Sequence, residues 1–64
     1  ILKGPLIELA PPMADHVAPG GRAILPGLLV VQAEAVTDAY LAAGFSLDAR
    51  EDIGEWSTLV MLRA

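Results

Sequence analysis

Cysteine is absent from the sequence, and histidine occurs once among the 64 residues. Disulfide bonds are therefore excluded, and a zinc site would have to take most of its ligands from carboxylates. A chain of this length buries only about 60% of the surface that it exposes when unfolded, so small domains commonly need a disulfide, a metal or a partner. Because 55% of the residues are nonetheless hydrophobic, we expect them to pack against additional protein. The lack of cysteine also favours a cytoplasmic location.

Positive charge is scarce as well. The basic residues are Lys3, Arg22, Arg50 and Arg63, against eight acidic residues, so the formal net charge is −4. The four are scattered and form no basic stripe along the chain. We therefore expect neither direct binding of nucleic acid nor binding to an anionic membrane surface.

Long apolar runs are missing too. The longest stretch without a charge lies between Arg22 and Glu34, and Pro26-Gly27 interrupts it. It is shorter than the ~18 residues that a membrane-spanning helix needs. The first residues also lack the uninterrupted apolar region of a secretion signal. Since the chain starts with Ile1 and not methionine, we expect a processed or truncated product.

Prolines and glycines divide the chain into elements. The first is a helical segment over residues 5–18, kinked at Pro11-Pro12 because proline removes an amide donor and crowds the preceding turn. Spacing of i, i+4 and i+8 predicts its buried side: Leu9, Met13 and Val17.

A second helix is predicted over residues 31–43. Its buried face consists of Ala33, Val36, Tyr40 and Ala43. Gly44 stands where a left-handed residue ends a helix, and Phe45 supplies the apolar contact of that motif. No serine, threonine, aspartate or asparagine is well placed to cap the start, so the first turn is not defined by the sequence.

Three strands are predicted, over residues 22–29, 45–52 and 56–62. The first is apolar without alternation, which suits a strand covered on both faces. Since proline cannot donate to a ladder, we expect Pro26-Gly27 to form the turn at its carboxyl tip. The second alternates apolar and polar residues and is predicted to be half-buried.

The connections restrict the topology of this α/β sheet. A helical crossover makes the strands at 22–29 and 45–52 parallel, and a hairpin makes the last strand antiparallel. That strand lies either between the other two or outside them. The apolar run at 59–62 favours the inserted position.

No catalytic constellation or metal site emerges from the residues. His16 stands alone and is best explained as a surface residue, and Trp56 as cover for a sheet edge. Asp48, Glu51, Asp52 and Glu55 lack the spacing of a calcium loop and are interpreted as a solvated turn. Ser46, Ser57 and Thr58 have no base in a nucleophile arrangement. Only the Pro26-Gly27 tip lies where open α/β sheets bind ligands.

Several motifs together resemble one family. They are Ile1-Leu2-x-Gly4-Pro5-Leu6-Ile7-Glu8-Leu9-Ala10-Pro11, Pro19-Gly20-Gly21-Arg22, Gly27-Leu28-Leu29, Gln32-Ala33, Ala43-Gly44-Phe45 and Gly54-Glu55-Trp56. The chain resembles the carboxyl-terminal quarter of PrmA-type methyltransferases, which methylate protein eleven of the large ribosomal subunit. The opening block and Gly54-Glu55-Trp56 are the most specific; Pro-Gly-Gly before a strand is shared with many methyltransferases.

The resemblance implies the Rossmann-like fold of S-adenosylmethionine (SAM)-dependent methyltransferases. Residues 1–64 would be an incomplete, carboxyl-terminal portion of the catalytic domain, with strands five, seven and six in that spatial order. The ligands of the cofactor would precede Ile1, so no catalytic or cofactor-binding residue is assigned here. Ile1, Leu2, Gly27 and Leu28 would lie beside the transfer site. Pro26 replaces a serine that is common in the family.

The function implied for the whole enzyme is methyl transfer from SAM to lysine and amino-terminal amines of the ribosomal protein. The chain alone is expected to be inactive, to bind no cofactor, and to self-associate through the strand at 22–29. The alternative is a small α/β interaction module that acts as a homodimer without enzymatic activity.

Overall fold

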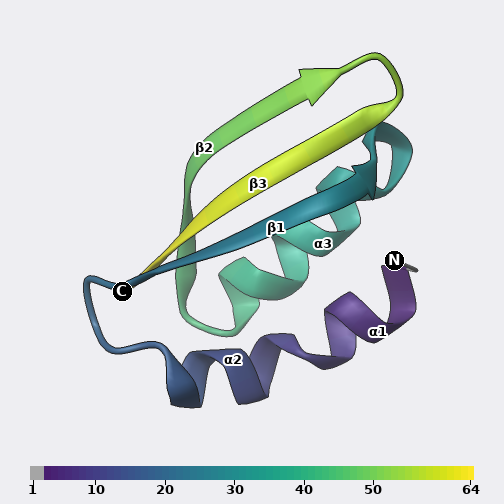
Figure 1. Ribbon diagram of the computed structural model, residues 1–64. Coiled ribbons are helices and arrows are strands. Elements are labelled where there is room, and N and C mark those ends of the chain that lie inside the picture. Colours follow the sequence, from purple (N-terminus) through teal and green to yellow (C-terminus); the bar gives the residue numbers. More distant parts are fainter. Residues whose placement is uncertain (1–2) are drawn as a thin grey trace.

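The computed structural model describes residues 3–64. Its elements are α1 (Lys3–Glu8), α2 (Ala10–His16), β1 (Arg22–Leu29), α3 (Val30–Ala42), β2 (Phe45–Ile53) and β3 (Trp56–Arg63). Figure 1 shows one twisted sheet with α3 packed across it and with α1 and α2 beyond α3. The described helices therefore cover one face of the sheet. None of the helices within residues 3–64 is both long enough and apolar enough to cross a lipid bilayer.

The strand order is β1-β3-β2, and β3 is antiparallel to both neighbours. β1 and β2 are consequently parallel, and α3 connects them. This confirms that the last strand is inserted between the other two. The alternating burial along β3 shows why: Ser57, Leu59 and Met61 face the helices and are fully buried.

The Pro26-Gly27 pair lies inside β1 and does not end it, so the predicted turn at the strand tip is wrong. Leu25 pairs with Leu59 and Leu28 with Ser57, which leaves two residues of β1 opposite one residue of β3. The pair is thus a β-bulge, in which Gly27 adopts a φ of 75°. The bulge accommodates Pro26 because the bulged residues are released from the ladder with β3, where proline could not donate.

The helical segment at the start is interrupted as predicted, with α1 ending at Glu8 and α2 beginning at Ala10. Leu9 still joins the two, since its amide donates to the Pro5 carbonyl at 3.1 Å and its carbonyl accepts from Met13 at 2.8 Å. The missing amides of the two following prolines prevent a regular helix through this point.

The buried side of this segment is one residue away from the predicted one. Leu6, Ala10 and Ala14 are buried, whereas Leu9 is 47% exposed and Met13 and Val17 are half-buried. Both rows have the same i, i+4, i+8 spacing, so periodicity alone cannot choose between them. Contact with α3 favours the row that places two small alanines toward the core.

Helix α3 confirms its predicted buried face, since Ala33, Val36 and Tyr40 are fully buried and Ala43 packs against the core. Gly44 has the expected left-handed φ of 103°. The helix begins without a side-chain cap of the usual kind. Instead, the Leu29 amide donates to Oε1 of Gln32 at 3.4 Å, which gives one free donor of the first turn a partner.

Strand β2 is half-buried only at its start, which corrects the predicted alternation. Phe45 is buried, but Leu47 is 43% exposed and every later residue of the strand is exposed. Leu47 pairs with Met61 and Ala49 with Val60, so Asp48 is an extra residue in a second bulge. The bulge reverses which side chains face the helices, and it places Arg50 and Asp52 where apolar residues would be needed for burial.

One core holds these elements together. Its buried residues are Leu6, Ala10, Ala14, Ala23, Leu25, Leu28, Ala33, Val36, Tyr40, Phe45, Leu59 and Met61. Tyr40 and Phe45 contact each other at the end of α3, with ring centroids 5.4 Å apart. The core therefore lies between α3 and the sheet, and the opposite face of the sheet is left without a covering element among the described residues.

Candidate functional site at the carboxyl end of the first strand

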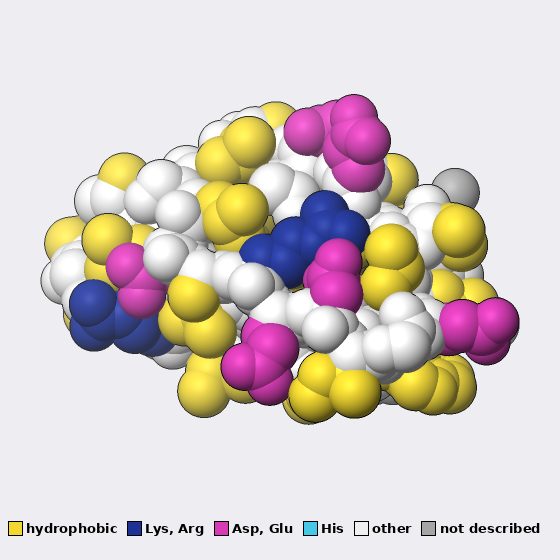
Figure 2. Space-filling model, turned by 90° about the horizontal axis from the view of Figure 1, so that it is seen from above, with side chains coloured by type: hydrophobic (Ala, Val, Ile, Leu, Met, Phe, Trp, Pro, Cys, Tyr) yellow, Lys and Arg dark blue, Asp and Glu magenta, His cyan; other side chains and the backbone are white. Residues whose placement is uncertain are grey.

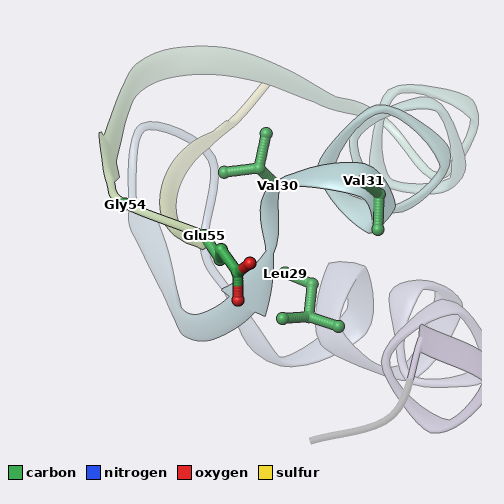
Figure 3. Close-up of a pocket in the computed structure, with 5 residues that line it drawn as sticks. All are labelled: Leu29, Val30, Val31, Gly54 and Glu55. Atoms are coloured by element: carbon green, nitrogen blue, oxygen red, sulfur yellow. The ribbon is translucent and has the colours of Figure 1, made fainter.

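An open hollow of about 410 Å³ lies where β1 passes into α3 (Figure 3). Leu29, Val30 and Val31 line it from that junction, and Gly54 and Glu55 line it from the turn between β2 and β3. The Val30 amide donates to the Glu55 carbonyl at 2.8 Å. This bond holds the turn against the start of the helix, so the hollow is built by backbone contacts between distant segments.

Among the described side chains that line the hollow, Glu55 supplies the one charge. In Figure 3 its carboxylate and the Leu29 side chain point the same way, while Val30 points to the opposite side. Val31 is 87% exposed at the helix start. The hollow therefore combines apolar walls with a single acidic group, at the end of the sheet where α/β folds commonly bind their ligands.

A second polar cluster lies across the β2–β3 hairpin. The buried Ser57 hydroxyl donates to Oδ1 of Asp52 at 2.7 Å, and Arg50 donates to both oxygens of Asp52 at 2.9 and 3.0 Å. These bonds, first from Arg50 and then from Ser57, lower the pKa of Asp52. An aspartate held ionised in this way is a weak base, so the cluster braces the hairpin and does not activate Ser57.

Sequence reasoning missed this pair, because it grouped Asp52 with an acidic turn and Ser57 with residues lacking a partner. The signal was present in the hairpin, since Asp52 and Ser57 are directly opposite in the register. Opposed residues of an antiparallel pair lie within hydrogen-bonding reach. Once the turn is placed at Gly54 and Glu55, Ile53 pairs with Trp56, and the next pair along the hairpin is Asp52 and Ser57.

The other acidic residues are dispersed and do not form a cation site. Arg22 and Asp48 form an ion pair of 2.9 Å across β3. Figure 2 shows the molecule from above, on the side of β2 in Figure 1. Basic and acidic side chains are interspersed with apolar ones on this surface. Within the described part of the chain, no three potential ligands come together for a metal ion.

The comparisons with known proteins decide the family. The model of the ribosomal protein L11 methyltransferase family (PrmA) matches residues 1–64. The chain belongs to the ribosomal protein L11 methyltransferase family.

Individual L11 methyltransferases are similar along most of the chain. The relative from Chromohalobacter salexigens is 54% identical over 56 residues, which cover 88% of this chain and 19% of the relative. The relative from Cellvibrio japonicus is 45% identical over 64 residues, which cover all of this chain and 21% of the relative. The chain thus spans about a fifth of the length of these curated relatives.

The fold of an L11 methylase matches as well. The crystal structure of the ribosomal protein L11 methylase from Lactobacillus delbrueckii subsp. bulgaricus superimposes with a TM-score of 0.89 at 27% identity. The match covers 98% of this chain and 33% of that one. It confirms the α/β architecture with the inserted last strand.

The residues that the family resemblance placed beside the transfer site have different environments. Ile1 and Leu2 lie outside the described residues. Gly27 is exposed on the bulge, whereas the Leu28 side chain is fully buried in the core. The hollow begins one residue later, at Leu29, so Leu28 belongs to the core beside the hollow and does not line it. His16 is exposed at the end of α2, as predicted.

Proposed function

We propose that this chain provides the carboxyl-terminal strands of the catalytic domain of an L11 methyltransferase, an enzyme that transfers methyl groups from SAM to lysine and amino-terminal amines of that ribosomal protein. The order β1-β3-β2 carries the proposal. Together with the family match over residues 1–64, it supports a sheet that continues beyond β1. A cytoplasmic location is part of the proposal, because ribosomal proteins are the substrates named for the relatives.

The described residues alone do not fit the cofactor. Of the side chains described at the hollow, Glu55 alone is charged, and no glycine-rich turn joins β1 to α3, since the strand continues directly into the helix. The ligands of SAM are therefore proposed to lie in those parts of the enzyme that this chain does not match. The 64 residues by themselves should neither bind SAM nor transfer a methyl group.

A segment exchange tests the proposal. In the Cellvibrio japonicus relative, the matched segment is replaced by residues 1–64 of this chain, which align with it over their full length. Transfer of labelled methyl groups from SAM to purified L11 is then measured. The exchanged enzyme is expected to be active, while a variant of the relative that lacks the segment and the 64-residue chain alone are expected to be inactive.

Two outcomes would contradict the proposal. One is an exchanged enzyme that unfolds at the temperature of its parent yet does not methylate L11. The other is methyl transfer, or SAM binding in a calorimeter, by the 64-residue chain alone.

A further inference from the structure

The apolar surface at the hollow extends beyond it, across the whole sheet. Leu29 pairs with Trp56, and Trp56 pairs with Ile53, so these three residues form one row over β1, β3 and β2. Ile53 is 69% exposed and Trp56 is 57% exposed. Exposed apolar side chains gathered at one place commonly mark a binding surface.

Glu55 adds a negative charge at the same end of the molecule. Within residues 4–64, the Glu55 carboxylate forms no hydrogen bond or ion pair, whereas Asp48 and Asp52 are each paired with an arginine. Glu55 is held beside the first turn of α3, because its backbone carbonyl accepts from the Val30 amide at 2.8 Å. Its charge is thus available to a cation that approaches from solvent.

We propose that Glu55 and the row Leu29–Trp56–Ile53 bind a basic side chain of the protein substrate. A lysine or arginine carries an apolar stem and a cationic head. The stem would lie along Leu29 and Val31, and the head would pair with Glu55. The indole of Trp56 adds a face that attracts cations. The inference rests on the proposed function, because it names the part of an L11 methyltransferase that contacts its protein substrate.

The test uses the active segment-exchanged enzyme described above. Glu55→Gln removes the charge and keeps the shape, and its backbone contact to Val30 is retained. Glu51→Gln is the matched control, because Glu51 is an exposed acid of the same hairpin that does not line the hollow. The KM for L11, the kcat and the affinity for SAM are measured for each variant.

Glu55→Gln is expected to raise the KM for L11 about two- to fivefold, the range for one exposed charge pair, with kcat and SAM affinity unchanged. Raising the salt concentration should shrink this difference. Glu55→Asp should recover part of the loss. Glu51→Gln should leave KM unchanged.

The outcomes separate the two proposals. If the exchanged enzyme is active but Glu55→Gln and Glu51→Gln have the same KM for L11, this inference is wrong and the proposed function stands. If Glu55 has a purely structural role, Glu55→Gln will lower the unfolding temperature without changing the KM for L11. That result also overturns the inference. If the folded exchanged enzyme is inactive, the proposed function itself fails.

Discussion

At the scale of single residues, two buried hydroxyl groups differ in their hydrogen bonding. The Ser57 hydroxyl has a strong acceptor in Asp52, whereas the Tyr40 hydroxyl is buried and has no hydrogen-bond partner among the described side chains. Burial raises the pKa of Tyr40. A buried hydroxyl without a partner costs free energy, so the ring of Tyr40, packed on Phe45, carries the stabilising contribution and the hydroxyl does not.

The Asp52 cluster predicts a dependence of stability on pH. Because the pKa of Asp52 is lowered below its ordinary value of 3.8 in the folded chain, its contribution is fully present above that value and is lost as the pH falls through the folded pKa. We expect Asp52→Asn to destabilise the chain at pH 7 and to have a smaller effect at pH 3. Chemical unfolding at both pH values measures the difference.

The matched control for this prediction is Asp48→Asn, which removes a more exposed ion pair with Arg22 and leaves no buried hydroxyl without its acceptor. It should change the free energy of unfolding less at pH 7. Equal effects of the two substitutions, or an Asp52→Asn effect that is the same at both pH values, would contradict the role given to the cluster.

At the scale of elements, glycines and prolines decide where strands bend and helices end. Gly27 and Gly44 both have positive φ, but their surroundings differ. A Cβ on Gly27 would meet nothing within 4 Å, whereas one on Gly44 would lie 3.3 Å from Nη1 of Arg63. Arg63 in turn donates to the Ala14 carbonyl at 2.9 Å and so ties the last strand to α2.

Alanine substitutions should therefore rank in a defined order. Gly27→Ala introduces only the strain of a left-handed alanine, about 1–2 kcal/mol. Gly44→Ala also introduces strain at a positive φ, and Nη1 of Arg63, 3.3 Å from the new Cβ, must in addition shift by a few tenths of an ångström, so it should lower the free energy of unfolding further. Chemical denaturation of both variants and of Gly4→Ala, a helix position with open space and no positive φ, checks the order. A Gly27→Ala effect equal to or larger than that of Gly44→Ala would contradict this account.

At the scale of the whole molecule, β1 is an edge of the sheet with no strand on its outer side among the described residues. The face opposite the helices also exposes apolar side chains, including Ile24 at 66%. Unpaired edges and apolar faces favour association with other chains. The bulge at Pro26 limits the regular part of this edge to its first half.

We therefore expect the isolated 64-residue chain to self-associate. Sedimentation velocity should show an apparent mass that increases with concentration, and Ile24→Lys should reduce the increase because it places a charge on the edge strand. Val31→Lys is the control, since it adds the same charge at an exposed position of α3 that is not part of the edge strand. A stable monomer at high concentration would contradict the prediction.

Much of the fold followed from local patterns. The proline-interrupted first helix, the buried face of α3, the left-handed Gly44 and the inserted last strand were all predicted, because each depends on spacing within a short segment or on a connection rule. The register of the buried row in α1 and α2 was missed by one residue, since two rows of equal spacing compete and only contact with α3 selects Leu6. For the hollow, the sequence indicated only the carboxyl end of the first strand and did not predict that the turn at Gly54 and Glu55 lies against it.

The sequence by itself determined the types and order of the elements and the family. Periodicity, proline and glycine are read within one segment and need no partner. The tertiary structure alone decided the two bulges, the exposure of β2, the Asp52–Ser57 bond and the hollow at Glu55. Each of these depends on how β3 pairs with strands that are distant in sequence, and a shift of one residue in that pairing would turn every following side chain to the opposite face.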